Sequence, residues 1–174
     1  MDFSQDYYTL LHLQPAFRLD MESLDRAYRE LQTEFHPDRF AHAGDAEQRL
    51  AVQWSTRINE AYQTLKSPFA RAKYLLELNG IHAMDANNTA MPAAFLMQQM
   101  EGREALMAAV AASDYDGLQA LENQTRAEAD RLKQELAIEL DDRQDYPAAG
   151  ETLRKYRFLD KFLADINNAY EEIE

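Results

Sequence analysis

The residues best equipped for chemistry are His36, Pro37 and Asp38, followed by Arg39, in a chain of 174 residues. The Asp38 carboxylate can accept charge-assisted hydrogen bonds, and the His36 imidazole offers a neutral donor and acceptor near pH 7. Pro37 has no backbone N–H and pushes His36 out of the helical region, so a helix should end there. The pattern favours a fixed polar corner that a partner can grip. The alternative is an ordinary helix terminator with a solvated Asp.

Two amphipathic segments must position this corner. Before it, Asp20 is a predicted N-cap, and an apolar stripe recurs at helical spacing through Leu24, Tyr28, Leu31 and Phe35. After it, a helix is predicted from Asp45, with Gln48 completing a capping box. The predicted stripe of this second helix is Leu50, Trp54, Ile58, Ala61 and Leu65. Two such helices joined by a loop of about ten residues should pack antiparallel, with the polar corner in the loop.

The rest of the chain also has helical periodicity. Ser67-Pro68 predicts a further helix that ends at Gly80 in a left-handed cap. Residues 81–92 are turn-rich and are the predicted linker. Three helices then follow, over 93–112, after Asp114 and after Pro147, and short connections predict an up-down three-helix bundle. The prediction is therefore an all-α protein with domains at 1–80 and 93–174.

Composition excludes several classes of function. The net charge is −13, which disfavours binding to nucleic acid or to an anionic membrane. Residues 79–174 carry most of this excess, which suggests two partners of different character. The absence of cysteine excludes disulfides, thiolate metal sites and catalytic thiols. With no signal peptide or spanning segment in the sequence, we expect a cytoplasmic protein without cofactor.

A helical carboxylate enzyme that binds two metal ions is the main alternative. Such sites need Glu-x-x-His on facing helices, and no His of this chain follows a Glu at that spacing. The zinc-protease pattern His-Glu-x-x-His is also absent. We therefore interpret the many carboxylates as a solvated surface and expect no metal and no catalytic residue.

The helix predicted from Ala93 carries more apolar residues than one buried face requires. Phe95, Leu106 and Val110 share one side, whereas Leu96, Met100 and Met107 lie beside it and Met97 lies further round. The excess indicates either a helix that buries two faces or an exposed binding patch.

The first half resembles the J domain. The resemblance rests on His36-Pro37-Asp38 between two antiparallel helices, supported by segments that flank it. These segments are Asp6–Leu11, Ala27–Leu31, Ile58–Leu65, and Ser67-Pro68 with Arg71 and Tyr74.

The second half is similar to the HscB family, the J-type co-chaperones of iron–sulfur cluster assembly. Phe95–Glu104 and Leu153–Lys161 carry this resemblance, and no Gly/Phe-rich linker follows Tyr74. The resemblance implies a non-enzymatic protein. Its J domain would stimulate the ATPase of HscA, a DnaK-type chaperone, and its C-terminal bundle would deliver the scaffold protein IscU. Because the chain has no cysteine, it should present the scaffold rather than carry the cluster.

The resemblance also implies two sets of binding residues. The expected chaperone-binding residues are His36, Pro37, Asp38 and Arg39, with Arg26 and Arg29 as candidates diluted by nearby acidic residues. The expected client-binding residues are Leu96, Met97, Met100, Glu101, Arg103, Glu104 and Phe158. We expect a monomer. A J protein with a different client remains an alternative, because the first half alone does not identify the client.

Overall fold

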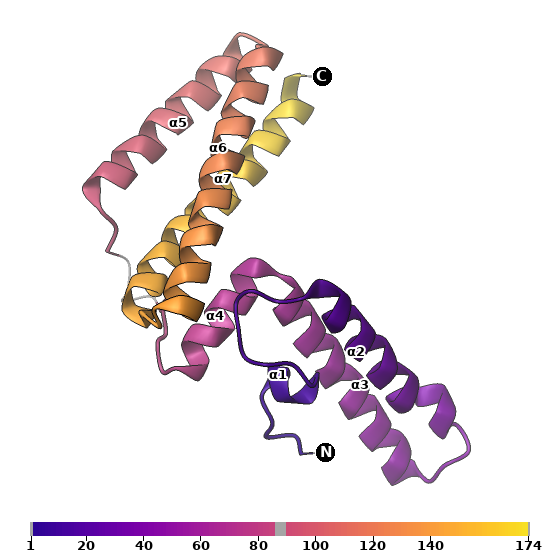
Figure 1. Cartoon of the computed structure of the whole chain (residues 1–174). Helices are drawn as coiled ribbons and strands as arrows, with labels where there is room; N and C mark the ends of the chain where they lie inside the picture. Colours follow the sequence, from indigo (N-terminus) through magenta and orange to yellow (C-terminus); the bar gives the residue numbers. More distant parts are fainter. Residues whose placement is uncertain (1, 86–89, 174) are drawn as a thin grey trace. The chain divides into compact units, whose positions relative to one another are not determined.

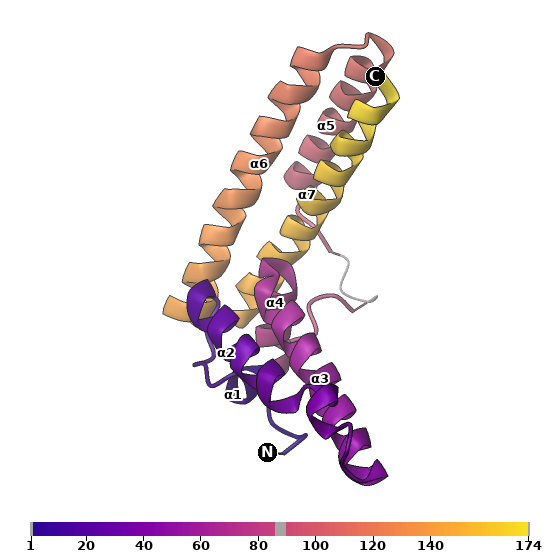
Figure 2. The ribbon, with the colours of Figure 1, turned by 90° about the vertical axis from the view of Figure 1, so that its right-hand side faces the viewer.

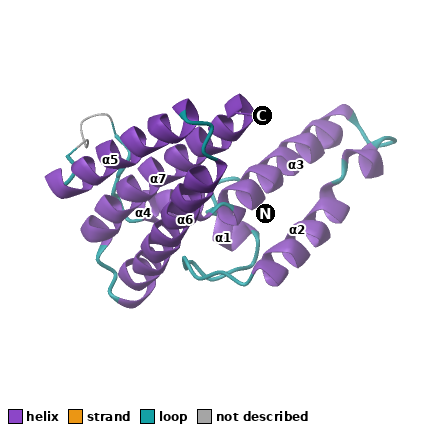
Figure 3. Ribbon diagram, turned by 90° about the horizontal axis from the view of Figure 1, so that it is seen from above, coloured by secondary structure: helices purple, strands orange, loops and turns teal. Residues whose placement is uncertain are grey.

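The computed structural model describes residues 2–85 and 90–173, and within these ranges every regular element is helical (Figure 3). The elements are α1 (Tyr7–Leu10), α2 (Met21–Phe35), η1 (Pro37–Phe40), α3 (Asp45–Lys66), α4 (Pro68–Leu78), α5 (Ala93–Ala111), α6 (Tyr115–Ala137), η2 (Ile138–Asp142) and α7 (Tyr146–Ile173). The chain divides into two compact units, residues 1–75 and 76–174, and the division falls inside α4. The predicted all-α class is confirmed.

In the first unit, α2 and α3 pack side by side as an antiparallel hairpin (Figure 1). Leu24, Leu31, Trp54, Ile58, Ala61 and Leu65 form its buried seam, as the helical spacing predicts. Polar contacts also join the helices, because the Tyr28 hydroxyl and the Gln32 amide both donate to Asn59 Oδ1 at 2.7 Å. The hairpin is therefore held along its length.

Three details of this hairpin differ from the predictions. Leu50 is 46% exposed, and Ala51 is buried in its place, three residues before the buried Trp54. Gly44 is the N-cap of α3, and its N–H donates to Glu47, whereas Gln48 donates to the carbonyl oxygens of Ala41 and Ala43. The residues after His36 form a 3₁₀ turn rather than an irregular loop.

The ends of the first unit are tied together by aromatic and polar contacts. The Tyr7 N–H donates to the Tyr74 hydroxyl at 3.0 Å, and the two rings stack with centroids 4.6 Å apart. Arg57 of α3 donates to the Gln5 carbonyl at 2.6 Å and lies over the Tyr7 ring. These contacts fix α1 against the hairpin.

The second unit is an up-down bundle of α5, α6 and α7, which lie side by side (Figure 2). Its core is dominated by leucines of α6 and by apolar residues of α7, which are Leu118, Leu132, Leu136, Leu153, Tyr156, Leu159, Phe162 and Ile166.

The segment between α4 and α5 begins at Gly80, which has the predicted left-handed conformation, with φ of 76°. Of the predicted linker, residues 86–89 lie outside the described residues. Ala83 is buried, and its carbonyl accepts from Arg154 of α7 at 3.5 Å.

At its C-terminal end, α6 widens into the π-helical turn η2. Glu139 in this turn is buried and accepts a hydrogen bond from the Thr152 hydroxyl of α7 at 3.2 Å. Burial raises the pKa of Glu139, because the charged carboxylate loses its hydration there. The sequence predicted one continuous helical seam through this point and did not predict the π turn.

Candidate interaction surfaces

The His-Pro-Asp corner has a defined backbone. His36 ends α2 in an extended conformation, and Pro37 begins η1. The Asp38 N–H donates to His36 Nδ1 at 3.3 Å, which joins the imidazole to the backbone of the turn. The Asp38 carboxylate is 90% exposed, with His36 Nδ1 3.6 Å from its Oδ2. The corner therefore presents a carboxylate to solvent from a turn that the neighbouring ring supports.

Arg39 anchors this corner to the preceding helix. Its guanidinium donates to the Thr33 carbonyl at 3.0 Å, and Thr33 is in the last turn of α2. Carbonyl groups at a helix C-terminus lack intrahelical partners, and a cation there also complements the helix dipole. The predicted binding residue Arg39 thus also has a structural role, which the sequence did not reveal because Thr33 lies six residues away.

Arg26 and Arg29 are both exposed on α2. Arg26 donates to the Ser23 hydroxyl at 3.0 Å. Asp25, one of the acidic residues expected to dilute this basic stripe, instead accepts from the Tyr62 hydroxyl of α3 at 2.8 Å. Asp25 therefore points toward the hairpin partner, and the solvent-facing dilution comes from Glu22, Glu30 and Glu34.

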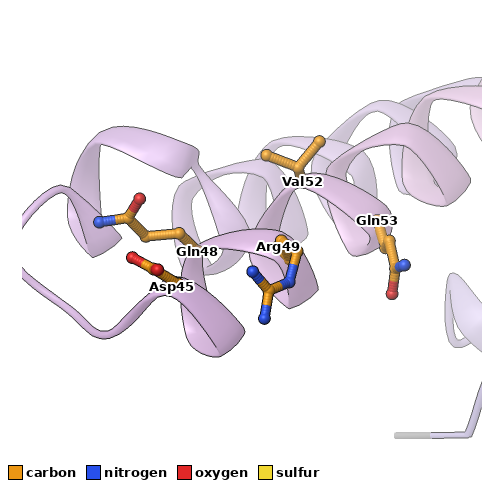
Figure 4. Close-up of a pocket in the computed structure, with 5 residues that line it drawn as sticks. All are labelled: Asp45, Gln48, Arg49, Val52 and Gln53. Atoms are coloured by element: carbon orange, nitrogen blue, oxygen red, sulfur yellow. The ribbon is translucent and has the colours of Figure 1, made fainter.

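An open depression of about 510 Å³ lies on the first turns of α3 (Figure 4). Asp45, Gln48, Arg49, Val52 and Gln53 line it. All five come from one helix, and Val52 is exposed. The sequence did not predict this feature. A shallow surface with mixed polar and apolar side chains fits a protein contact better than an enclosed substrate site.

The predicted client-binding residues lie together on the second unit. On α5, Leu96 is 41% exposed and both Met97 and Met100 are 63% exposed. Phe158 of α7 is also exposed, and its ring meets the buried Phe95 ring edge-on with centroids 6.0 Å apart. The helix therefore buries one face and leaves apolar side chains exposed beside it, so it does not bury two faces.

Charged side chains border this patch. Glu101, Arg103 and Glu104 are exposed on α5, and Arg103 approaches Asp165 of α7 at 3.9 Å. An apolar centre with a charged rim is the usual anatomy of a protein–protein interface. Met107, which was not among the predicted client-binding residues, is 71% exposed on the same helix.

Gly102 explains how α5 approaches α7. A Cβ atom at this position would lie 3.2 Å from Cε1 of Phe162, which is closer than side-chain carbons normally pack. The buried Phe162 ring thus occupies the space that a side chain at residue 102 would need. The structure therefore assigns this glycine to close packing between α5 and α7.

The described ranges show no group of three or more His, Asp or Glu side chains placed to bind a metal ion. No described helix is both long and apolar enough to cross a membrane.

Both halves of the chain match known protein families. The DnaJ domain family matches residues 6–74, and the family described as the HSCB C-terminal oligomerisation domain matches residues 91–167. A co-chaperone protein HscB homolog from Azoarcus sp. (strain BH72) is 45% identical over the whole chain and 98% of its own length. The chain belongs to the HscB family. An HscB homolog from Paraburkholderia phymatum is 47% identical over 98% of the chain and 97% of its own length.

Solved HscB structures agree with the fold of this HscB-family protein. Chaperone HscB from Vibrio cholerae has a TM-score of 0.86 and 34% identity, and covers 98% of this chain and 100% of its own. Human HscB has a TM-score of 0.87 and 29% identity over 97% of this chain and 83% of its own. Yeast Jac1, at 23% identity and a TM-score of 0.73 over 97% of this chain and 95% of its own, shares the fold. This family member is thus a co-chaperone with an N-terminal J domain, and its relatives are co-chaperones rather than enzymes.

Proposed function

We propose that this HscB-family protein stimulates ATP hydrolysis by an HscA-type chaperone through its J domain. Its C-terminal bundle brings the iron–sulfur scaffold IscU to that chaperone. The chain itself catalyses nothing in this scheme. It raises the local concentration of client at the chaperone, and it contributes the contact that triggers hydrolysis.

The exposed Asp38 carboxylate is the observation that supports the chaperone half most strongly. A carboxylate that is 90% exposed on a supported turn is available to a partner arginine. Such a charge-assisted hydrogen bond contributes about 1.5–3 kcal/mol. Pro37 limits the backbone freedom that binding would otherwise remove. Arg39 holds the turn to α2 and keeps a positive charge beside it.

The exposed patch on α5 and α7 supports the client half. Leu96, Met97, Met100 and Phe158 form its apolar part, and methionines adapt readily to an irregular partner surface. Glu101, Arg103 and Glu104 supply the rim that would orient the client.

Binding measurements with purified IscU test the client half. Wild type and the Leu96→Ala/Met100→Ala variant are compared by calorimetry, with circular dichroism to verify the fold. We expect the double variant to bind at least tenfold more weakly, since each truncation removes apolar contact at the patch centre. Equal binding would contradict the assigned patch, and no binding by wild type would favour a J protein with another client.

A further inference from the structure

The most exposed large apolar side chain described in this chain is Met107, which lies outside the predicted client patch. It borders an open groove of about 460 Å³ between α5 and α7. The groove is lined by Leu106, Met107, Val110, Ala111, Asp165, Asn168, Ala169 and Glu172. Its apolar character and its exposed methionine require an explanation that packing within the bundle does not supply.

Small residues explain why the groove exists. Ala109 of α5 and Ala169 of α7 are buried here, and they pack with Leu118 of α6 as the core of this end of the bundle. Alanines fill little of the space between two helices, so a depression remains above them. Leu106 and Val110 pack against this cluster and form the apolar wall.

Helical geometry makes the groove continuous with the predicted patch. At about 100° per residue, Leu96, Met100 and Met107 lie within about 40° of one another on α5. Met107 follows Met100 by about 10 Å along the helix axis. The patch and the groove therefore follow one another along the same side of α5, with Arg103 between them.

The size of ordinary interfaces favours a longer contact than the patch alone. Specific complexes bury about 800 Å² and about 20–30 residues on each partner. The predicted patch supplies only a fraction of that number. An interface that extends along α5 to the groove comes closer to that range without using a second face of the bundle.

Charge indicates what kind of side chain enters the groove. Asp165 and Glu172 stand on its α7 side, and Arg103 of α5 approaches Asp165 at 3.9 Å, which leaves Glu172 as the carboxylate of the rim without a nearby cation among these residues. A second copy of this chain would bring further acidic residues to an acidic rim, which like-charge repulsion disfavours. A client segment with an apolar side chain flanked by lysine or arginine matches both the apolar floor and the acidic rim.

We infer that the groove around Met107 is a second anchoring point for the client held by the Leu96–Met100 patch. It accepts an apolar side chain with a neighbouring basic residue. This inference rests on the proposed function, since it extends the same interface. Met107 would then determine how tightly and in which register the client lies along α5.

The test measures binding of purified IscU to the full chain by fluorescence anisotropy. We expect Met107→Ala to bind about tenfold more weakly and Met107→Leu to bind nearly as well as wild type, because leucine keeps the apolar contact. Glu172→Lys should weaken binding at low salt more than at high salt. The matched control is Met84→Ala, an exposed methionine of the same unit that is not part of α5, which should bind like wild type.

Three results would overturn the inference. The first is a Met107→Ala variant that binds IscU as tightly as wild type, while the Leu96→Ala/Met100→Ala variant binds weakly. That result would reject the groove and leave the proposed function intact. The second is equal loss in Met107→Ala and Met84→Ala. The third is a dimer in sedimentation that Met107→Lys dissociates while IscU binding persists, which would assign the groove to a second copy. Unchanged binding in the Leu96→Ala/Met100→Ala variant would instead reject the proposed client patch itself.

Discussion

The two units present their binding residues in opposite ways. In the first unit, the exposed group is a single carboxylate on a short 3₁₀ turn, supported by the His36 ring and by the bond from Arg39 to α2. In the second unit, the exposed groups are several apolar side chains, most of them on α5. The first arrangement offers one strong directional contact, whereas the second offers many weak contacts spread over an area.

This difference suggests different tolerances to mutation. A directional contact fails when its one charged group is removed, even if the surroundings are unchanged. A distributed apolar contact loses affinity in steps, and its methionines can rearrange around a changed partner. Variants of the two units should therefore differ in how steeply function declines.

The largest effect is expected for Asp38→Asn. Loss of the charged acceptor should reduce stimulation of HscA roughly tenfold to hundredfold. Since the side chain is 90% exposed, the melting temperature and IscU binding should remain near wild type. Steady-state phosphate release measures the stimulation, circular dichroism measures the melting temperature, and calorimetry measures IscU binding. A folded Asp38→Asn variant that still stimulates HscA fully would contradict a single directional contact in the first unit.

The next largest effect is expected for variants of the second unit, which should lose IscU binding and keep the stimulation of HscA. Leu96→Ala alone should weaken IscU binding by a few-fold, with a further loss when Met100→Ala is added. Stimulation of HscA in the absence of IscU should be unchanged in both variants. A single variant that abolishes binding completely would contradict a distributed contact.

Gly102→Val should destabilise the second unit by about 2 kcal/mol, since a branched side chain cannot fit against Phe162. Gly102→Ala is the graded control. Its methyl group also crowds the ring, but alanine gains about 1 kcal/mol of helix propensity over glycine, so its net change should be small. Thermal unfolding measures both variants. A valine variant as stable as wild type would show that α5 does not depend on this close approach.

The smallest effect concerns the pH dependence set by Glu139. Its pKa is raised by burial, so the folded state holds this proton more tightly than the unfolded state. The contribution to stability is present at low pH and is lost as the pH rises through the folded-state pKa. Glu139→Gln should remove this loss and raise the melting temperature at pH 7 by about 2–4 °C relative to wild type, with little difference at pH 4. Thermal unfolding curves that do not differ between Glu139→Gln and wild type at either pH would contradict the raised pKa of Glu139.

Helix positions and the polar corner could be predicted from the sequence because their signals are local. Asp20, Ser67 and Gly80 cap helices where their residue types favour it, and Pro37 stops α2 where its ring requires it. These features depend on residues a few positions apart, which is the range over which sequence patterns carry information.

Features that depend on distant segments were not predicted. Ala51 rather than Leu50 is buried in the first unit, although both residues are at helical spacing from Trp54. Gly102 acquires its role from Phe162, which lies sixty positions later in the chain. The π turn at Glu139 and the groove at Met107 likewise arise from packing between helices. The exposed patch was visible as an apolar excess on α5, although its outer extent was not.

Steady-state ATP turnover by HscA, with this protein and IscU added separately and together, tests whether one chain joins the two activities. We expect the two together to stimulate turnover by more than the sum of their separate effects. We also expect either Asp38→Asn or Leu96→Ala/Met100→Ala to remove this synergy. The first should do so without loss of IscU binding, and the second without loss of stimulation by the J domain alone. Simple additivity with wild type, or synergy that survives both variants, would contradict these expectations.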